Sequence, residues 1–265
     1  MPSLKHTLDD LVQYLEYARD EGRRGVEVSP EVMKNISSKP VKSVLRTAAA
    51  GARVPVASAN VSKPVVLSGG SVSADVGLKK ISSVINSCKK CSLYETRTKT
   101  VPGQGAMNPD IMFIGEAPGA DEDLQGLAFV GRAGQLLTKM IEAMGYKRDE
   151  IFIGNILKCR PPGNRPPMPD EMEKCLPYLK EQIVLIKPKV IIALGATAVK
   201  GLLNTTTGIS KLRGSWLSFE GIDLMPTYHP AYLLRNPPAK KEVWEDLKTV
   251  LERLGRTPPP VKKSS

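Results

Sequence analysis

The sequence has no long apolar run, and it contains only two histidines and four cysteines among 265 residues. The longest apolar run, Val190–Leu194 with its neighbours, has the length of a strand and ends at Gly195. We therefore expect no transmembrane helix and no membrane partner. Residues 1–6 lack the apolar stretch of a signal peptide, so we expect a reducing, cytoplasmic location.

Acidic side chains are fewer than basic ones, which gives a net charge of +11 and an isoelectric point near 9.5. Residues 1–79 carry 11 basic and 8 acidic side chains, so +8 of this charge falls on residues 80–265. A surplus of this size favours a polyanionic partner such as nucleic acid, although charge alone predicts association and not fold.

The four cysteines, Cys88, Cys91, Cys159 and Cys175, follow the pattern Cys-x2-Cys-x67-Cys-x15-Cys. In a reducing compartment a Cys-x2-Cys pair predicts a metal or redox site, to which the two single cysteines add two thiolates. Zinc and an iron–sulfur cluster both accept four thiolates, but the pattern lacks the two short pairs of a structural zinc finger. Such widely separated ligands favour a [4Fe–4S] cluster that joins distant segments.

Composition divides the chain into four parts. Apolar residues recur at helical spacing from about residue 4 to residue 21, which predicts an amphipathic helix that either binds a partner protein or remains a solvated appendage. The stretch that follows is rich in Ser, Ala, Val, Pro and Gly and predicts a flexible linker. We expect a helical appendage at 1–36, a linker at 37–75, a main domain at 76–257 and a disordered tail at 258–265.

Short apolar runs alternate with helical patterns in the main domain. The runs are residues 111–114, residues 151–156, Val190–Leu194 and Ile222–Thr227. The helical patterns are residues 134–144, Pro169–Ile186, residues 197–203 and residues 241–254. This alternation predicts an α/β fold, a three-layer α/β/α sandwich with a short central parallel sheet. The ligand crevice of such a sheet lies at the carboxyl ends of its strands.

Three distinctive segments each follow a predicted strand. They are Gly115-Glu116-Ala117-Pro118-Gly119, then Asn155 with Lys158-Cys159-Arg160-Pro161-Pro162, and then His229-Pro230-Ala231-Tyr232-Leu233-Leu234-Arg235. In this order and spacing they resemble the family 4 uracil-DNA glycosylases, the iron–sulfur branch of the uracil-DNA glycosylase superfamily. The resemblance covers about residues 80–255, includes all four cysteines in order and leaves out residues 1–75.

This resemblance implies a DNA-repair enzyme. Such an enzyme flips deoxyuridine out of single- or double-stranded DNA, hydrolyses the N-glycosidic bond and leaves an abasic site. The resemblance also implies one [4Fe–4S] cluster, held by the four cysteines and serving structure rather than electron transfer, because the reaction is hydrolytic. We further expect a monomer that is associated with the nucleoid of a prokaryotic cell.

Three residues are candidates for recognising and releasing the base. Negative charge develops mainly on uracil O2 as the bond breaks, and His229, at a strand end, is placed to donate a hydrogen bond there. Asn155 can accept from N3–H and donate to O4 with one carboxamide, which is the role of the matching Asn in the family. Phe129 is the candidate stacking platform for the flipped base, the alternative being a core residue.

The loop after the first predicted strand concerns the attacking water and the C5 edge of the base. Glu116 is the candidate for positioning the water, but related family 1 enzymes carry an Asp one position further on, at Ala117 here. The water is therefore held by Glu116, by the backbone of Ala117 and Gly119, or by both. Family 1 enzymes exclude thymine with a Tyr at the place of Gly119. By analogy Glu122 would crowd C5, or else act as an ordinary carboxylate at a helix N-terminus.

Contacts with DNA are predicted after the histidine motif. Leu233 and Leu234 fit a wedge that replaces the flipped base, and Arg235 fits a phosphate anchor. Residues 208–214 are expected to form a loop that faces a phosphate. Other basic side chains could hold the DNA backbone or simply be solvated: Lys158, Arg160, Arg165, Lys211 and Arg213.

Two other functions fit parts of the pattern. A protein of the same superfamily could bind or trap uracil-DNA without efficient turnover, through a His in an inserted basic loop. Residues 159–169 contain neither a His nor an insertion, which disfavours covalent trapping. A cytosolic redox carrier could use the cluster, but Asn155 and His229 would then have no purpose. The sequence therefore favours the glycosylase.

Overall fold

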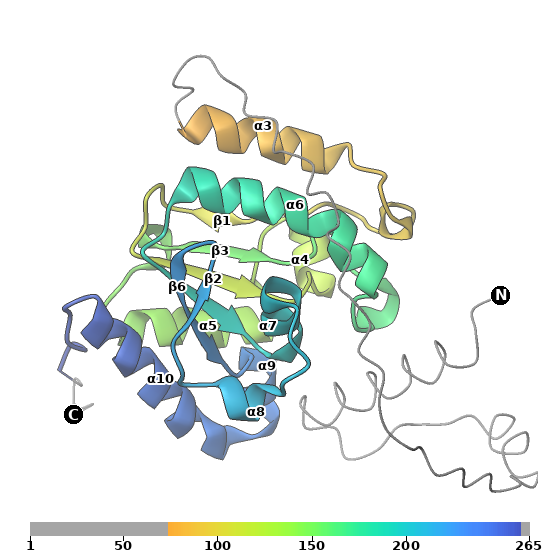
Figure 1. Ribbon diagram of the computed structural model, residues 1–265. Helices are drawn as coiled ribbons and strands as arrows, with labels where there is room; N and C mark the ends of the chain where they lie inside the picture. Colours follow the sequence, from red (N-terminus) through yellow and green to blue (C-terminus); the bar gives the residue numbers. More distant parts are fainter. Residues whose placement is uncertain (1–73, 261–265) are drawn as a thin grey trace, which may run out of the picture. The chain divides into compact units, whose positions relative to one another are not determined.

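The computed structural model describes residues 74–260 of the chain (Figure 1). The predicted amino-terminal helix lies outside the described residues, and so does nearly all of the predicted linker. The predicted protein partner of that helix therefore stays a prediction. Helix α3 (Ala74–Asn86) begins before the predicted domain boundary at residue 76. Its Ile81 and Ile85 are buried in the core, so the domain includes the chain from Ala74 onward.

A six-stranded sheet forms the centre of the domain, in the order β1-β3-β2-β4-β6-β5. The strands are β1 (Gln104–Gly105), β2 (Ile111–Gly115), β3 (Phe152–Asn155), β4 (Val190–Leu194), β5 (Leu217–Phe219) and β6 (Ile222–Thr227). The four inner strands are parallel, as predicted, whereas β1 and β5 pair antiparallel at the two edges. The edge strands were not predicted, because two or three residues are too few to show a period.

The inner strands form because they are continuous apolar runs that can be buried on both faces. Every residue of β2 and β4 is buried, and both strands are rich in β-branched side chains or large apolar ones. Successive side chains point to opposite faces, so Met112 and Ile114 join one core whereas Ile111 and Phe113 join another. Both faces of the sheet therefore require a covering layer of helices.

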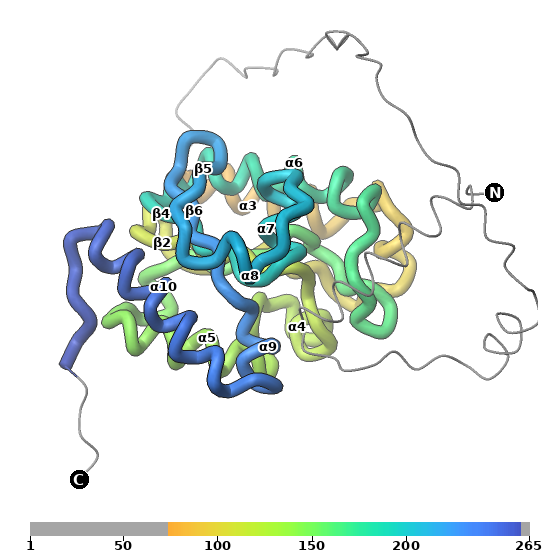
Figure 2. The backbone as a smooth tube through the Cα atoms, turned by 60° about the horizontal axis from the view of Figure 1, so that its bottom comes forward, coloured from red at the N-terminus to blue at the C-terminus, as the bar shows by residue number. Residues whose placement is uncertain are grey.

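Helices cover both faces, which confirms the predicted three-layer sandwich. The helices after α3 are α4 (Ala120–Gln125), α5 (Arg132–Ala143), α6 (Pro169–Ile186), α7 (Ala196–Leu203), α8 (Ile209–Leu212), α9 (Pro230–Arg235) and α10 (Lys240–Arg253). Helices α3, α6 and α7 pack on one face, and α5, α9 and α10 on the other. Figure 1 shows α3 and α6 above the sheet with α5 and α10 below it, and Figure 2 brings the lower layer forward.

The predicted helix boundaries agree with the structure to within two residues. Helix α6 begins with Pro169 and is capped by Glu171, whose Oε2 accepts from the Met168 N–H at 2.8 Å. The segment at 208–214 differs from its prediction. It contains α8, whose Ile209 is buried in the core, so the segment is partly helical rather than a simple loop, while Ser210, Lys211 and Gly214 are exposed.

The chain leaves neighbouring strands β2 and β4 toward opposite faces of the sheet. Helix α5 follows β2 on one face, whereas α7 follows β4 on the other. Such a divergence opens a crevice at the carboxyl ends of the strands. The three predicted motifs begin at these carboxyl ends. Within residues 74–260, no helix has the length and apolar character needed to span a bilayer.

Candidate active site

A pocket of about 360 Å³ lies at the carboxyl ends of the strands. Most of the residues that the sequence singled out line it, namely Glu116, Ala117, Gly119, Glu122, Phe129, Asn155, His229 and Arg235. They come from the chain between β2 and α5, which includes α4, from the end of β3, and from the two ends of α9, so segments more than a hundred residues apart converge on one site. The predicted wedge residues, Leu233 and Leu234, are outside this lining.

Asn155 is the last residue of β3 and its side chain is almost fully buried. Its Oδ1 has no hydrogen-bond partner, and no other buried side-chain nitrogen or oxygen among residues 74–260 is left in this state. A buried polar atom without a partner costs about 1–3 kcal/mol. The pocket therefore presents an acceptor whose hydrogen bond awaits a ligand.

Gly115 keeps open the space beside Asn155. A Cβ at position 115 would lie 2.5 Å from Asn155 Oδ1 and 2.5 Å from Phe129 Cζ. Real Cβ atoms essentially never come this close to another heavy atom, so any side chain here would displace the Phe129 ring or the Asn155 carboxamide. Sequence reasoning assigned no role to Gly115, although it opens the first motif.

His229 enters the site as the residue that caps α9. Its Nδ1 accepts a hydrogen bond from the Ala231 backbone N–H at 3.1 Å, so the nitrogen left to carry a proton and donate is Nε2. Pro230 occupies the first helical position, where its fixed φ suits a helix start. The His229 ring lies 5.6 Å from the Phe129 ring, centroid to centroid. The imidazole is thus oriented by its own helix.

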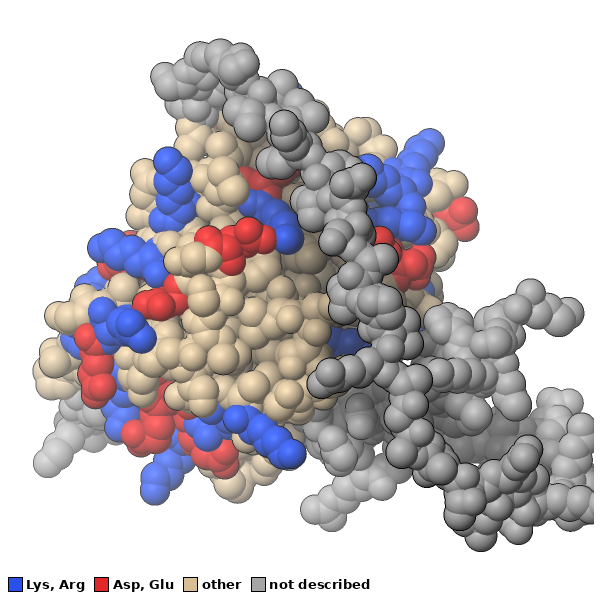
Figure 3. All heavy atoms as spheres, in the orientation of Figure 1, with Lys and Arg blue, Asp and Glu red and all other residues tan. Residues whose placement is uncertain are grey.

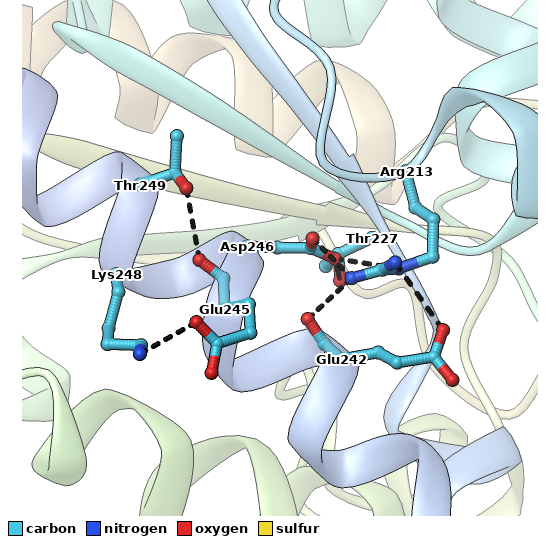
Figure 4. A network of polar contacts seen from close by, with 7 residues as sticks. All are labelled: Arg213, Thr227, Glu242, Glu245, Asp246, Lys248 and Thr249. Atoms are coloured by element: carbon cyan, nitrogen blue, oxygen red, sulfur yellow. Dashed lines mark hydrogen bonds and ion pairs between the residues drawn. The ribbon is translucent and has the colours of Figure 1, made fainter.

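A buried polar network supports the strand that leads to His229 (Figure 4). Thr227 Oγ1 donates to Asp246 Oδ2 at 2.6 Å, and Arg213 contacts both carboxylate oxygens, at 2.5 and 3.1 Å. Burial raises the pKa of Asp246, opposed by the hydrogen bond from Thr227 and the charge of Arg213. Of the two alternatives left open for Arg213, a DNA contact or a solvated surface position, these contacts match neither, because they tie Arg213 to Asp246. Asp246, on α10, was missed because its partners lie far away in the sequence.

The Glu122 carboxylate joins two loops by accepting hydrogen bonds from their backbone N–H groups. Its Oε1 accepts from the Val130 and Gly131 N–H groups at 2.8 and 2.9 Å, and its Oε2 accepts from the Gly119 N–H at 3.1 Å. A Cβ at position 119 would lie 2.7 Å from Oε2, so glycine is required for this contact. Of the two predicted roles, these contacts favour the carboxylate at a helix N-terminus, since Glu122 is the third residue of α4.

Phe129 is buried and has a positive φ of 52°, which is unusual for a bulky residue. Arg148 holds this conformation, because its Nη2 donates to the carbonyls of Ala128 at 2.6 Å and Phe129 at 2.9 Å. A Cβ on Gly134 would collide with the Phe129 carbonyl, which explains the glycine there. Burial lowers the pKa of Arg148. The ring is thus both a core residue and a wall of the pocket.

Burial excludes Leu233 and Lys158 from contact with DNA, whereas Arg165, which lines the pocket and pairs with Glu171, stays a candidate. Leu233 is 1 % exposed and packs in the core beneath α9, so it cannot be a wedge, whereas Leu234 is 38 % exposed. Arg165 is held by Glu171 through contacts of 2.9 and 2.5 Å. Lys158 is 1 % exposed, and burial lowers its pKa to about 8. A buried ammonium cannot hold a DNA phosphate at the surface.

Surface charge on the face drawn in Figure 3 is mixed. Basic and acidic side chains alternate across its left and lower parts, so the surplus of positive charge is not gathered into one patch there. Beside the pocket, the Arg160 Nε–H donates to Asn164 Oδ1 at 2.7 Å. The exposed side chains of Arg132 and Arg235 line the pocket and add two positive charges. Positive charge near the pocket thus comes from three separate segments: the start of α5, the end of α9 and the chain that follows β3.

A second pocket is lined by all four cysteines, Cys88, Cys91, Cys159 and Cys175, and none of them forms a disulfide. Donors surround the sulfurs: Arg97 Nη1 lies 3.0 Å from Cys159 Sγ, Tyr178 Oη lies 3.3 Å from Cys88 Sγ, and the Lys158 N–H lies 3.3 Å from Cys175 Sγ. Within residues 74–260, no three His, Cys, Asp or Glu side chains are arranged to hold a single metal ion.

Burial is the largest influence on the pKa of three of these thiols. It raises the pKa of Cys91 and Cys159 and raises that of Cys175 to about 12. Nearby donors oppose this effect, with Arg97 lowering the pKa of Cys159 and Lys158 lowering that of Cys175. Burial therefore favours the protonated thiol over the thiolate at these three positions.

Comparison with known proteins identifies the family. The model of the uracil DNA glycosylase superfamily matches residues 102–248. The type-4 uracil-DNA glycosylase of Sulfurisphaera tokodaii is 47 % identical over 184 residues, which cover 66 % of this chain and 84 % of that protein. The type-4 enzyme of Archaeoglobus fulgidus is 43 % identical over 183 residues, covering 66 % and 92 %.

Similarity to another branch is weaker. The type-5 uracil-DNA glycosylase of Pyrobaculum aerophilum is 31 % identical over 153 residues, which cover 51 % of this chain and 67 % of that protein. The match to the type-4 proteins is therefore both longer and closer than this one. The chain belongs to the uracil-DNA glycosylase superfamily, in the branch of the type-4 enzymes.

Proposed function

We propose that this protein is a uracil-DNA glycosylase that removes uracil from DNA and so initiates base excision repair. The observation that carries the proposal is the buried, unpartnered Oδ1 of Asn155, which shares one pocket with the Nε2 donor of His229. An acceptor and a donor in one pocket match the polar edges of a uracil base. The type-4 relatives, all named uracil-DNA glycosylases, support the same conclusion.

Recognition of the base would fall to Asn155 and Phe129. The Asn155 Oδ1 accepts from uracil N3–H, and its Nδ2 donates to O4. Cytosine presents the opposite pattern at these two positions, so the fixed carboxamide discriminates between the two bases. The Phe129 ring stacks on the flipped base and is held in place by Arg148 and Gly134.

Bond cleavage would depend on His229 and on the loop after β2. As the glycosidic bond breaks, negative charge develops on uracil O2, and the His229 Nε2–H donates to it. Water attacks the sugar carbon from which the base departs. Glu116, together with the backbone at Ala117 and Gly119, lines the side of the pocket where that water would be positioned.

The four cysteines would hold one [4Fe–4S] cluster. They line one pocket, they carry no disulfide, and three of the sulfurs accept hydrogen bonds, as cluster thiolates do. When bound, the cluster supplies cross-links between the loop at Cys88–Cys91 and α6, which carries Cys175. These cross-links would fix Lys158 and Cys159 just beyond Asn155.

The remaining proposals concern DNA and location. Leu234, exposed beside the pocket, would fill the gap left by the flipped base, and Arg235 would contact a phosphate. The protein would act as a monomer on the nucleoid DNA of a prokaryotic cytoplasm. A partner of the amino-terminal segment remains a prediction.

The test is uracil release from an oligonucleotide that contains one uracil, compared with the same oligonucleotide containing thymine. We expect release from the first only, and repeated turnover separates an enzyme from a protein that merely binds or traps uracil-DNA. Asn155→Ala should lose both rate and discrimination, because the base edge is then left without its partner. Binding without release by the full, cluster-containing protein would favour the trapping alternative.

A further inference from the structure

Lys158 is a fully buried cation whose hydrogen-bond partners among the described residues are all neutral. Its Nζ donates to the Asn155 backbone carbonyl at 2.9 Å and to Gln182 Oε1 at 2.7 Å. Gln182 is equally buried, and its Nε2 donates onward to the Pro102 carbonyl at 2.9 Å. An ammonium removed from water is costly unless it serves a specific arrangement, and a methionine would fill the same space without that cost.

The position of the Asn155 carbonyl explains what the ammonium does. The Ile156 N–H of the same peptide group donates to the Gly115 carbonyl of β2 at 2.9 Å. Because the peptide is trans, the Asn155 carbonyl points the other way, toward the edge strand β1. That antiparallel strand begins only at Gln104, opposite Ile153, and so does not reach the Asn155 carbonyl. Lys158 supplies the missing donor.

The main chain of Lys158 is fixed independently of its side chain. Its N–H donates to Cys175 Sγ at 3.3 Å, and its carbonyl accepts from the Val101 N–H at 2.8 Å. The side chain then returns three residues along the chain to Asn155. A residue anchored at the cysteine pocket thus holds one side of the peptide that carries the unpartnered carboxamide, while the pairing with β2 holds the other side.

We propose that Lys158 is a positioning residue for base recognition, which holds the Asn155 peptide and thereby aims the Asn155 carboxamide at the base. This inference rests on the proposed function, because it assigns the geometry of that same site. The buried ammonium does not touch the base and takes no part in bond cleavage.

The experiment replaces Lys158 in the full-length, cluster-containing protein. Lys158→Met keeps the volume and removes both hydrogen bonds. We expect the single-turnover rate on uracil-DNA to fall at least about tenfold, with a similar weakening of inhibition by free uracil. Iron content and affinity for thymine-containing DNA should stay at the parent level. Gln182→Met is the matched control, because it disturbs the same buried network but leaves the contact between Lys158 and Asn155.

Two comparisons decide the result. Lys158→Gln keeps an N–H donor without the charge, and we expect it to recover part of the cleavage rate and part of the inhibition by free uracil. This variant also keeps the inference testable if Lys158→Met does not fold. Lys158→Met at the parent rate with parent uracil inhibition would overturn the inference, as would equal losses in Lys158→Met and Gln182→Met. A parent protein that releases no uracil would instead overturn the proposed function.

Discussion

At the scale of single residues, His229 carries its N–H on Nε2, because its Nδ1 accepts from Ala231. We predict that His229→Ala lowers the single-turnover rate on uracil-DNA about a hundredfold, the usual effect of losing one preorganised hydrogen bond to a developing anion. DNA binding, measured by fluorescence anisotropy, should change little, because the bond strengthens only in the transition state.

The opposite pattern would contradict this assignment. If His229→Ala weakens DNA binding but cleaves bound DNA at the parent rate, the imidazole serves binding rather than bond cleavage. The matched control is Asp110→Asn, which lies before β2, at the amino ends of the strands, and should leave the cleavage rate unchanged.

Gly115 allows a sharper test of the pocket. We predict that Gly115→Ala abolishes most uracil release, because its methyl group would lie 2.5 Å from both Asn155 Oδ1 and Phe129 Cζ. Gly154→Ala, on the neighbouring strand, is the matched control, because the nearest atom to its Cβ would lie at an ordinary 3.7 Å. Uracil release and circular dichroism measure activity and folding separately. Equal activity of the two variants would show that the space beside Gly115 is not used by the base.

At the scale of helices and strands, most of the architecture was predictable from the sequence. The runs at Val190–Leu194 and Ile222–Thr227 match β4 and β6. Strand β4 is apolar throughout because it is buried along its whole length, whereas β6 is buried only from Leu224 onward. The motif residues were found because active residues of such a sheet collect at strand ends. What the sequence could not give was orientation. Leu233 and Lys158 adjoin motif residues but point into the core, which depends on long-range packing.

The cysteine pocket joins three elements and carries its own prediction. We expect purified protein, prepared without oxygen, to be brown and to contain about four iron atoms per chain, because the cysteines line one pocket from the Cys88–Cys91 loop, Cys159 and α6. Metal analysis and visible absorption measure this directly. Stoichiometric zinc without iron would show that the site holds the simpler metal.

Asp110 links four segments at the amino ends of the strands, far from the site. Its carboxylate lies 2.7 Å from Lys189 Nζ and accepts from Tyr146 Oη at 3.0 Å, and Arg256 lies nearby. The pKa of Asp110 lies below its ordinary value of 3.8, and the hydrogen bond from Lys189 is the largest cause. Since the folded pKa is depressed, this stabilisation is complete above about pH 4 and is lost as the pH falls through that region.

We therefore predict that Asp110→Asn lowers the midpoint of thermal unfolding by about 2–4 °C at pH 7, as expected for a partly exposed ion pair. The difference from the parent should shrink as the pH falls below about 4, because the parent carboxylate then takes up a proton as well. Calorimetric scans from pH 3 to about pH 7 would measure it. A difference that stays constant over this range would show that the charge of Asp110 does not contribute.

At the scale of the whole molecule, similarity and structure cover the same part of the chain. The superfamily match spans residues 102–248, and the described residues extend from 74 to 260. The type-4 relatives above match about two-thirds of this chain. Residues 1–73 therefore stand apart from the site in sequence, and their composition predicts a helix and a linker.

We predict that a fragment of residues 74–260 releases uracil at the rate of the full chain, because it contains both pockets, all four cysteines and α3 with its buried Ile81 and Ile85. A fragment that starts at residue 88 keeps the cysteines but removes α3, and should be less stable because α6 loses an apolar neighbour. Uracil release and thermal unfolding of both fragments would be compared with those of the full chain. A folded but inactive 74–260 fragment would show that the amino-terminal segment takes part in catalysis, which the resemblance to the type-4 enzymes does not anticipate.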